Sequence, residues 1–224
     1  ELPEKWPYRH RRPITGITSM GQVLWENYDK LDENQRRQAT KEIAKSSERL
    51  TSLVDNLIDL SKLENLKYKL NKTTVNLSSL VYKRLEICQK LYIKEENKEN
   101  LSFDLEIEDK LIISCDKYYI TRTIDNIIIN AIQYCPQGKI TIILHKNQQA
   151  EVELNIKDEG IGIPKDELFD VFGAFVISSK TKTPAGGRGI GLALCKKVIE
   201  LHNGKIWVEQ NSSKGVTFRF TLPT

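Results

Sequence analysis

Most of the information in this sequence lies in three stretches: Asn126-Ile-Ile-Ile-Asn130-Ala131, Asp158-Glu-Gly160-Ile-Gly162 and Gly187-Arg-Gly189-Ile-Gly191-Leu192. The residues around the first are typical of a helix, those before the second of a strand, and those after the third of another helix. Each stretch is a weak signal by itself. Together, and in this order, the three stretches predict a pocket that holds a nucleotide and its metal ion.

Asn126 and Asn130 are four residues apart, so their side chains project from the same face of a helix. An amide oxygen is a neutral, hard ligand of the kind that Mg²⁺ accepts together with phosphates and water. The residues between the two asparagines are all isoleucine, which places the amides beside a core, where polar groups need partners. The alternative is that both amides only cap or solvate the helix.

Asp158 follows a strand expected at residues 152–156, and Gly160 and Gly162 come soon after it. A carboxylate in this place accepts a hydrogen bond from an exocyclic amine, which favours adenine over guanine. The glycines permit the backbone to approach a flat ring closely and to adopt angles that other residues resist. For this stretch alone, an ordinary turn is the alternative.

Gly187, Gly189 and Gly191 precede a helical pattern, and backbone N–H groups at the start of a helix bind phosphate. The spacing is not that of a P-loop, and no strand–helix–strand unit of a dinucleotide site surrounds it. The polar segment between Phe175 and Gly187 is typical of a mobile lid. Lys180 and Lys182 of this segment, and Arg188 just after it, are candidates to reach a triphosphate. For each lysine the alternative is a solvated loop with an incidental charge.

The composition argues against several classes of protein. The 34 basic and 30 acidic residues are mixed along the chain, whereas a nucleic-acid binder gathers its basic residues on one face. No apolar run approaches the ~20 residues that span a bilayer, and no signal peptide opens the chain. We therefore expect a cytoplasmic location, with a membrane reached only through segments outside this chain. The four separated cysteines and three unclustered histidines predict reduced core thiols and no zinc site.

Residues 1–66 predict a helical hairpin. The apolar residues of its second helix, expected at about residues 33–65, follow the seam pattern of a coiled coil: Ile43, Leu50, Leu53, Leu57 and Leu60. Ser46 interrupts this seam. A lone hairpin has too little core, so we predict a homodimer in which a second copy completes a four-helix bundle. The alternative is that the apolar stripe packs on the rest of the chain.

Residues 67–224 predict an α+β domain, an α/β sandwich with helices on one face of a mixed sheet. The strands are expected at about residues 73–77, 101–107, 111–114, 140–144, 152–156, 206–208 and 216–222. The helices are expected at about residues 77–94, 117–134 and 192–202.

At these residues the chain resembles the sensor histidine kinases of two-component systems, over nearly its whole length. The resemblance implies a dimerisation and histidine-phosphotransfer hairpin followed by a Bergerat-type ATP-binding domain. It assigns to nucleotide binding Asn126, Asn130 and Tyr134 of the N-box, Asp158, Gly160 and Gly162 of the first glycine box, and Gly187, Arg188, Gly189, Gly191 and Leu192 of the second. Phe169 and Phe172 match the F-box. Gln133 departs from the pattern, because a lysine often supports phosphate there.

The resemblance also implies an activity. A protein-histidine kinase uses Mg-ATP to phosphorylate its own histidine, and the phosphoryl group then passes to an aspartate of a response-regulator receiver domain. In this scheme Asn130 holds Mg²⁺ and Asp158 reads adenine. In related ATPases the position of Asn126 is a glutamate that activates water, and an amide cannot serve as that base, which argues against a hydrolase.

The acceptor histidine is where the chain departs most from the resembled family. The family's histidine stands five residues before a proline, and counting back from Pro13 places Tyr8 there. His10 is the only nearby histidine, and a shift of two residues is roughly 200° around a helix. Three alternatives stay open: an irregular helix start makes His10 the acceptor, the chain does not autophosphorylate in the usual way, or the natural sequence was altered here. His10 is our candidate acceptor, and the rival function is a nucleotide-binding signalling scaffold without transfer activity.

Overall fold

The computed structural model describes residues 12–93, 100–181 and 189–224. By internal contacts the chain divides into two compact units, residues 1–59 and 60–224. The division lies inside the second long helix, because the last residues of that helix belong to the second unit, where Leu63 is buried in the core. The domain boundary after residue 66 stays a prediction.

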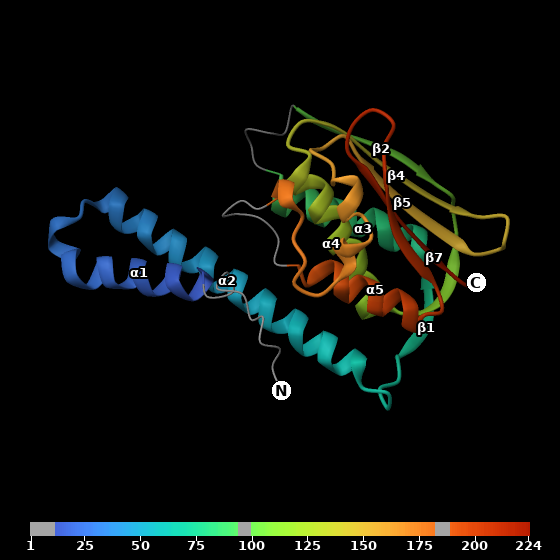
Figure 1. The fold of residues 1–224 in the computed structure, drawn as a ribbon, viewed down its shortest axis with the longest axis horizontal. Coiled ribbons are helices and arrows are strands. Elements are labelled where there is room, and N and C mark those ends of the chain that lie inside the picture. The colour runs from blue at the N-terminus through green and yellow to red at the C-terminus, as the bar shows by residue number, and fades with distance from the viewer. Residues whose placement is uncertain (1–11, 94–99, 182–188) are drawn as a thin grey trace. The chain divides into compact units, whose positions relative to one another are not determined.

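The first unit is a helical hairpin, as the sequence predicted (Figure 1). Its elements are helix α1 (Arg12–Asn27), the 3-10 turn η2 (Tyr28–Lys30) and helix α2 (Glu33–Glu64). Helix α2 begins with a capping box: the Asp32 carboxylate accepts the backbone N–H of Gln35 at 2.8 Å, and the Gln35 side chain accepts that of Asp32 at 3.0 Å. The Arg36 guanidinium stacks 4.2 Å from the centroid of the Tyr28 ring and donates to the Tyr28 carbonyl. These local contacts hold the reversal of the chain.

The serine that interrupts the predicted seam has a packing reason. A Cβ atom on Gly16 of α1 would lie 2.8 Å from Ser46 Oγ of α2, so the two helices approach closely at this pair. A larger residue at either position would push the helices apart. Val54 and Ile58 of α2 remain 43% and 47% exposed, so apolar surface of the hairpin stays uncovered.

The second unit alternates helices and strands. In chain order these are β1 (Lys72–Asn76), α3 (Leu77–Tyr92), β2 (Leu101–Ile107), β3 (Ile112–Asp116), α4 (Lys117–Tyr134), β4 (Gly138–Lys146), β5 (Val152–Asp158), α5 (Gly191–Leu201), β6 (Lys205–Gln210) and β7 (Val216–Leu222). Three 3-10 turns lie between β5 and α5: η4 (Lys165–Glu167), η5 (Asp170–Phe172) and η6 (Ser179–Thr181). Every predicted strand and helix is present, and the 3-10 turns are additional.

Five strands form the main sheet, in the order β2-β4-β5-β7-β6. Strands β2 and β4 are parallel and the other neighbours are antiparallel, so the predicted mixed sheet is confirmed. Strands β1 and β3 form a separate antiparallel pair. The sequence did not predict this separation, because strand periodicity indicates which face a residue takes and not which strand it pairs with.

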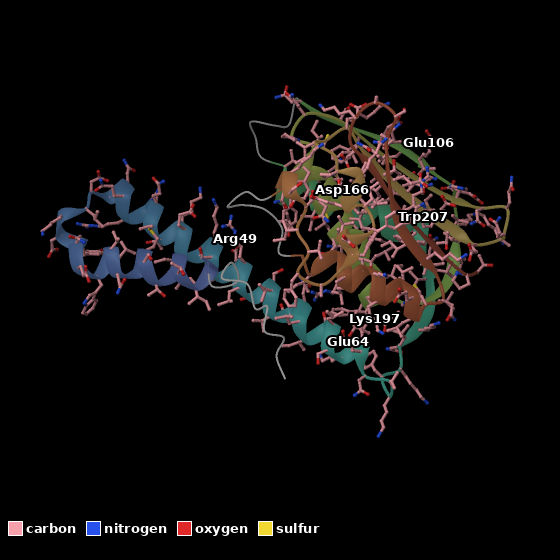
Figure 2. The ribbon with its side chains drawn as sticks, viewed as in Figure 1. Arg49, Glu64, Glu106, Asp166, Lys197 and Trp207 are labelled. Atoms are coloured by element: carbon pink, nitrogen blue, oxygen red, sulfur yellow. The ribbon has the colours of Figure 1, made fainter. Side chains whose placement is uncertain are left out.

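Helices α3, α4 and α5 cover one face of the main sheet (Figure 1). Alternate residues of β4, namely Ile140, Ile142 and Leu144, are fully buried in the core on this face. Arg84 of α3 and Asp125 of α4 join two of the helices through N–H···O contacts of 2.6 and 2.8 Å. Figure 2 shows Glu106 and Trp207 on the two edge strands of the sheet, β2 and β6.

The four cysteines are free and buried, which confirms the prediction of core thiols. Burial raises the pKa of the Cys88 and Cys195 thiols to about 12, so both stay protonated. No helix in the described part of the chain is long and apolar enough to cross a bilayer.

His202, at the end of α5, ties this helix to the start of α4. Its Nε2 accepts the backbone N–H of Asp116 at 2.9 Å, and its Nδ1 lies 2.7 Å from the carbonyl oxygen of Val198. The first contact needs an unprotonated Nε2, so the imidazole is neutral and its proton is on Nδ1. Burial lowers the pKa of His202, and the nearby Lys72 acts in the same direction.

We expect His202→Gln to weaken the pH dependence of stability. Because the pKa of His202 is lowered in the folded state, the folded protein binds fewer protons at this residue than the unfolded chain does. The contribution of His202 to the free energy of unfolding therefore falls as the pH drops below the histidine pKa of the unfolded chain, near ~6.5. Between pH 7.5 and 5.5 the parent should lose about 1 kcal/mol more stability than the variant. Urea unfolding of both proteins at the two pH values measures this difference, and equal losses would contradict a neutral, buried His202.

Candidate nucleotide-binding site

Asp158 ends strand β5 with its side chain inside the protein, 3% exposed. The carboxylate accepts the backbone N–H of Gly160 at 2.8 Å and that of Val216. Burial raises the pKa of Asp158 to about 6, and these two hydrogen bonds partly oppose the rise. A buried carboxylate at a strand end is therefore available to accept a further hydrogen bond from a ligand.

The glycines around Asp158 allow three backbone segments to meet. A Cβ atom on Gly160 would lie 2.3 Å from the carbonyl oxygen of Tyr134, the last residue of α4. Gly162 has a positive φ of 71° and lies opposite Gly215 of the β6–β7 turn. A Cβ atom added to Gly162 would lie 3.7 Å from the Gly215 carbonyl oxygen. At Gly160 only glycine permits this approach without displacing the backbone, whereas at Gly162 it is the positive φ that favours glycine.

Helix α4 brings the three sequence stretches together. Near the middle of α4, the side chain of Asn126 lies against the start of α5. A Cβ atom added to Gly191 would lie 3.4 Å from the Asn126 amide. The Asn126 Nδ2 is 3.5 Å from the Gly191 carbonyl oxygen and 3.7 Å from Cys195 Sγ. At the C-terminal end of α4, the Tyr134 carbonyl accepts the N–H of Ile161 at 3.1 Å. The amide of Asn130 lies between these contacts, half-buried, and has no hydrogen-bond partner among the described residues.

The segment before α5 carries part of the second glycine stretch. Gly189 has a φ of 71°, its carbonyl accepts the N–H of Phe175 at 2.7 Å, and a Cβ there would lie 2.4 Å from the carbonyl oxygen of Val176. Lys180 Nζ donates to the Ile161 carbonyl at 3.0 Å, so this cation borders the first glycine stretch. Leu192 lies half-buried in the first turn of α5, packed against the core. His10, Lys182, Gly187 and Arg188 lie outside the described residues.

The two phenylalanines of the F-box differ. Phe172 is buried and meets Phe218 of β7 edge to face, with ring centroids 6.3 Å apart. Phe169 is 91% exposed. Phe172 therefore anchors the segment after the first glycine stretch to the sheet, and Phe169 does not.

Sequence reasoning missed Asn211, Thr217 and Gly215 at the site. Asn211 Nδ2 donates to the backbone carbonyl of Asp158 at 2.8 Å, and its Oδ1 accepts the Thr217 hydroxyl at 2.6 Å. These residues belong to the β6–β7 hairpin, far from Asp158 in the sequence. The only signal in the sequence is a polar turn that ends in glycine, which is common in hairpins.

The residues fit a nucleotide and one magnesium ion. A buried carboxylate suits an adenine amine. The Asn130 amide, for which the described part of the chain offers no hydrogen-bond partner, suits a cation that also takes phosphate oxygens and water. No group of three or more His, Cys, Asp and Glu side chains in the described ranges is placed to hold a metal ion by itself. A metal at this site would therefore depend on the nucleotide phosphates.

The fold and site define a class of ATP-binding protein. Residues 115–224 match the family described as "Histidine kinase-, DNA gyrase B-, and HSP90-like ATPase", so the second unit contains an ATP-binding domain of this family. Residues 11–66 match the "His Kinase A (phospho-acceptor) domain". This second match begins one residue after His10.

Individual relatives agree with both matches. The chain is 33% identical to the sensor histidine kinase WalK of Bacillus subtilis (strain 168), over 95% of this chain and 34% of the relative. It is 31% identical to a WalK of Staphylococcus aureus, over 95% of this chain and 51% of the relative. Among solved structures, the Acinetobacter baumannii histidine kinase AdeS is 26% identical, with a TM-score of 0.71 and 95% of each chain covered. The chain thus spans about a third to a half of these WalK relatives.

The chain belongs to the sensor histidine kinases of two-component systems and contains their phosphoacceptor and ATP-binding domains. These comparisons lend no support to the rival function of a scaffold without transfer activity.

Proposed function

We propose that this chain is the catalytic core of a sensor histidine kinase, which transfers the γ-phosphoryl group of ATP to a histidine of its hairpin. The observation that carries the proposal is the meeting of the three sequence stretches along α4, around a buried carboxylate at a strand end. The two family matches, in the order acceptor domain and then ATPase domain, support it.

The side chains of the site divide the work of holding Mg-ATP. Asp158 accepts the exocyclic amine of adenine, Asn130 contributes an amide oxygen to Mg²⁺, and Asn126 lies beside the start of α5, where backbone N–H groups face phosphate. Mg²⁺, when bound, neutralises charge on the phosphates. Lys180, Lys182 and Arg188 are further candidate cations for the phosphates. Tyr134, whose backbone carbonyl meets the first glycine stretch, is a candidate to border the base.

An imidazole nitrogen of the hairpin attacks the γ-phosphorus in line. The N–P bond forms, the P–O bond to ADP breaks, and ADP leaves, so catalysis is mainly positioning and charge neutralisation. His10 is the proposed acceptor, because His145 lies on β4 and His202 is buried in the ATP-binding unit. Transfer to an aspartate of a response-regulator receiver domain follows.

Incubation with γ-labelled ATP tests this proposal. The expected result is label on the protein that is lost in acid and kept in base, which is the behaviour of phosphohistidine. Denatured protein and α-labelled ATP serve as controls for adsorption. Absence of covalent label, with ATP binding intact, would refute the transfer activity.

Asn130→Ala should weaken the binding of magnesium in the nucleotide complex. Removing a metal ligand should raise the magnesium concentration needed for half-maximal ATP binding by on the order of 10–100-fold. Thr121→Ala is the control, since Thr121 lies on the opposite side of α4 and bonds only the Lys117 carbonyl. Identical magnesium titrations of the parent and Asn130→Ala would leave Asn130 as a structural amide.

The exposed apolar side chains of α2 support the homodimer. Val54 and Ile58 are one turn apart on one face of the helix, and both are nearly half exposed. Soluble bundles bury such a stripe against another helix. A second copy of the hairpin supplies that helix.

Val54→Glu should convert the dimer to a monomer, because an unpaired charge buried at an interface costs several kcal/mol. Ser52→Glu adds the same charge at an exposed position on the other side of α2 and should leave the dimer intact. Light scattering at micromolar concentration distinguishes the two states. A parent chain that is already monomeric would show that the bundle assignment is wrong.

We place this core in the cytoplasm. The relatives are named sensor histidine kinases, and the two WalK relatives are about two to three times as long as this chain, which leaves room for membrane attachment in further segments of the parent protein.

A further inference from the structure

The turn between β6 and β7 is fastened by one side chain, Asn211. Its backbone N–H donates to the Gly215 carbonyl at 3.2 Å. Its Nδ2 donates to the Lys214 carbonyl at 2.9 Å and to the Asp158 carbonyl at 2.8 Å, and its Oδ1 accepts the Thr217 hydroxyl at 2.6 Å. Both amide hydrogens and the amide oxygen of Asn211 therefore have partners. One hydrogen and the oxygen reach residues outside the turn, Asp158 of β5 and Thr217 of β7.

This turn lies directly against Asp158, the proposed reader of the base. A Cβ atom on Gly215 would be 1.9 Å from the Asp158 carbonyl oxygen and 2.7 Å from its carboxylate. The same glycine faces Gly162 of the first glycine stretch. The next residue, Val216, donates its N–H to the Asp158 carboxylate. A shift of the turn would therefore move the carboxylate, its hydrogen-bond donor and the glycine stretch together.

The ladder between β5 and β7 ends just before this point. Its last pair at this end is Lys157 with Thr217, so no further strand residue of β7 pairs with Asp158. At this point the Asn211 amide donates to the Asp158 carbonyl in place of a strand residue of β7. Because a buried carbonyl without a partner is costly, loss of this donor would favour fraying of the strand end or entry of water.

We propose that Asn211 is a positioning residue for Asp158, which fixes the carboxylate that selects adenine. This inference rests on the proposed function, in which Asp158 reads the base. In this proposal Asn211 acts on Asp158 and not on the nucleotide. It acts by holding the end of β5 and the β6–β7 turn in one arrangement.

Another asparagine shows what a purely local role looks like. Asn147, in the β4–β5 turn at the opposite end of the sheet, accepts the N–H groups of Gln149 and Glu151 and donates to the Glu151 side chain. All of these partners lie within its own turn. Asn211 differs because it reaches Asp158, 53 positions away in the sequence.

The experiment compares Asn211→Ala with Asn147→Ala in the full chain. Carbon NMR of the Asp158 carboxyl group, without nucleotide, measures its titration. In Asn211→Ala the pKa of Asp158 should move from about 6 toward its ordinary value, because water reaches the strand end. In Asn147→Ala it should not move. Calorimetry should show ATP binding about tenfold weaker and a smaller ATP-to-GTP affinity ratio in Asn211→Ala only.

Asn211→Asp and Thr217→Val supply two further changes. Asn211→Asp keeps the acceptor for Thr217 and removes the donor to Asp158, so it should lower the ATP-to-GTP affinity ratio as Asn211→Ala does. Its added negative charge raises the pKa of Asp158, so only its affinity ratio, and not its titration, is compared with that of Asn211→Ala. Thr217→Val releases only the amide oxygen and should shift the titration less, in the same direction, which decides the matter if Asn211→Ala does not fold.

A lower melting temperature of Asn211→Ala with an unchanged Asp158 titration and ATP-to-GTP ratio would reduce Asn211 to a turn former and overturn the inference. A parent chain that binds no nucleotide would refute the proposed function instead. The titration of Asp158 would still decide the positioning role.

Discussion

Asp158→Asn is expected to weaken ATP binding by about tenfold to a hundredfold, the loss of a charge-assisted hydrogen bond of ~1.5–3 kcal/mol. The carboxylate is buried and already accepts two backbone N–H groups. An amide that turns its oxygen toward these donors points its NH₂ group at the adenine amine, and the opposite orientation sets the NH₂ group against Gly160. Either orientation loses a hydrogen bond.

Calorimetry with ATP and GTP measures this prediction, and selectivity for adenine should fall with affinity. Asp166→Asn is the matched control, because Asp166 is an exposed carboxyl group on η4 (Figure 2). Unchanged ATP affinity in Asp158→Asn would remove Asp158 from the site.

The raised pKa of Asp158 adds a pH dependence with a defined sign. Below its pKa of about 6 the carboxyl group is protonated in the free protein, and a ligand that needs the carboxylate must first displace the proton. The affinity of the parent should therefore fall by up to about tenfold for each pH unit below 6. Asp158→Asn lacks this titration. Protonation of ATP affects the affinity of both proteins equally, so the ratio of the two affinities at each pH reports the titration of Asp158 alone.

His10→Gln is expected to abolish the acid-labile label completely. Imidazole is neutral and nucleophilic near pH 7, whereas the hydroxyl of Tyr8 has an ordinary pKa near ~10 and needs a base to attack. Phosphate on tyrosine would also survive acid. His10 departs from the family's spacing to Pro13 by two residues, and a proline, such as those at positions 7 and 13, has no N–H to donate to a helical hydrogen bond.

Tyr8→Phe and His145→Gln are the controls, and both should keep the label. Label that persists in His10→Gln would show that the acceptor assignment is wrong. A parent chain without label would show that this departure from the family's motif has removed transfer.

Local patterns predicted the helices and strands, because hydrophobic periodicity and capping residues act over a few neighbouring positions. The capping box at Asp32, the alternation of buried residues along β4 and the strand end at Asp158 are all readable in this way. Two glycine stretches and the Asn126–Asn130 pair also predicted the pocket. The prediction that these stretches belong to one site rested on their order along the chain.

Contacts between distant segments were not predictable in this way. The separate pairing of β1 with β3, the close approach of Gly16 to Ser46 and the contact of Gly160 with the end of α4 depend on where the chain returns in space. Sequence periodicity carries no information on such partners.

Asn211 shows the division most clearly. By itself the sequence determined that a carboxylate stands at the end of β5, followed by glycines, and that a polar turn joins the last two strands. Only the tertiary structure decided that this turn meets that carboxylate, because the two segments become neighbours through the antiparallel pairing of β5 with β7. The sequence therefore indicates the residues proposed to bind, and only the fold indicates a residue proposed to hold one of them in place.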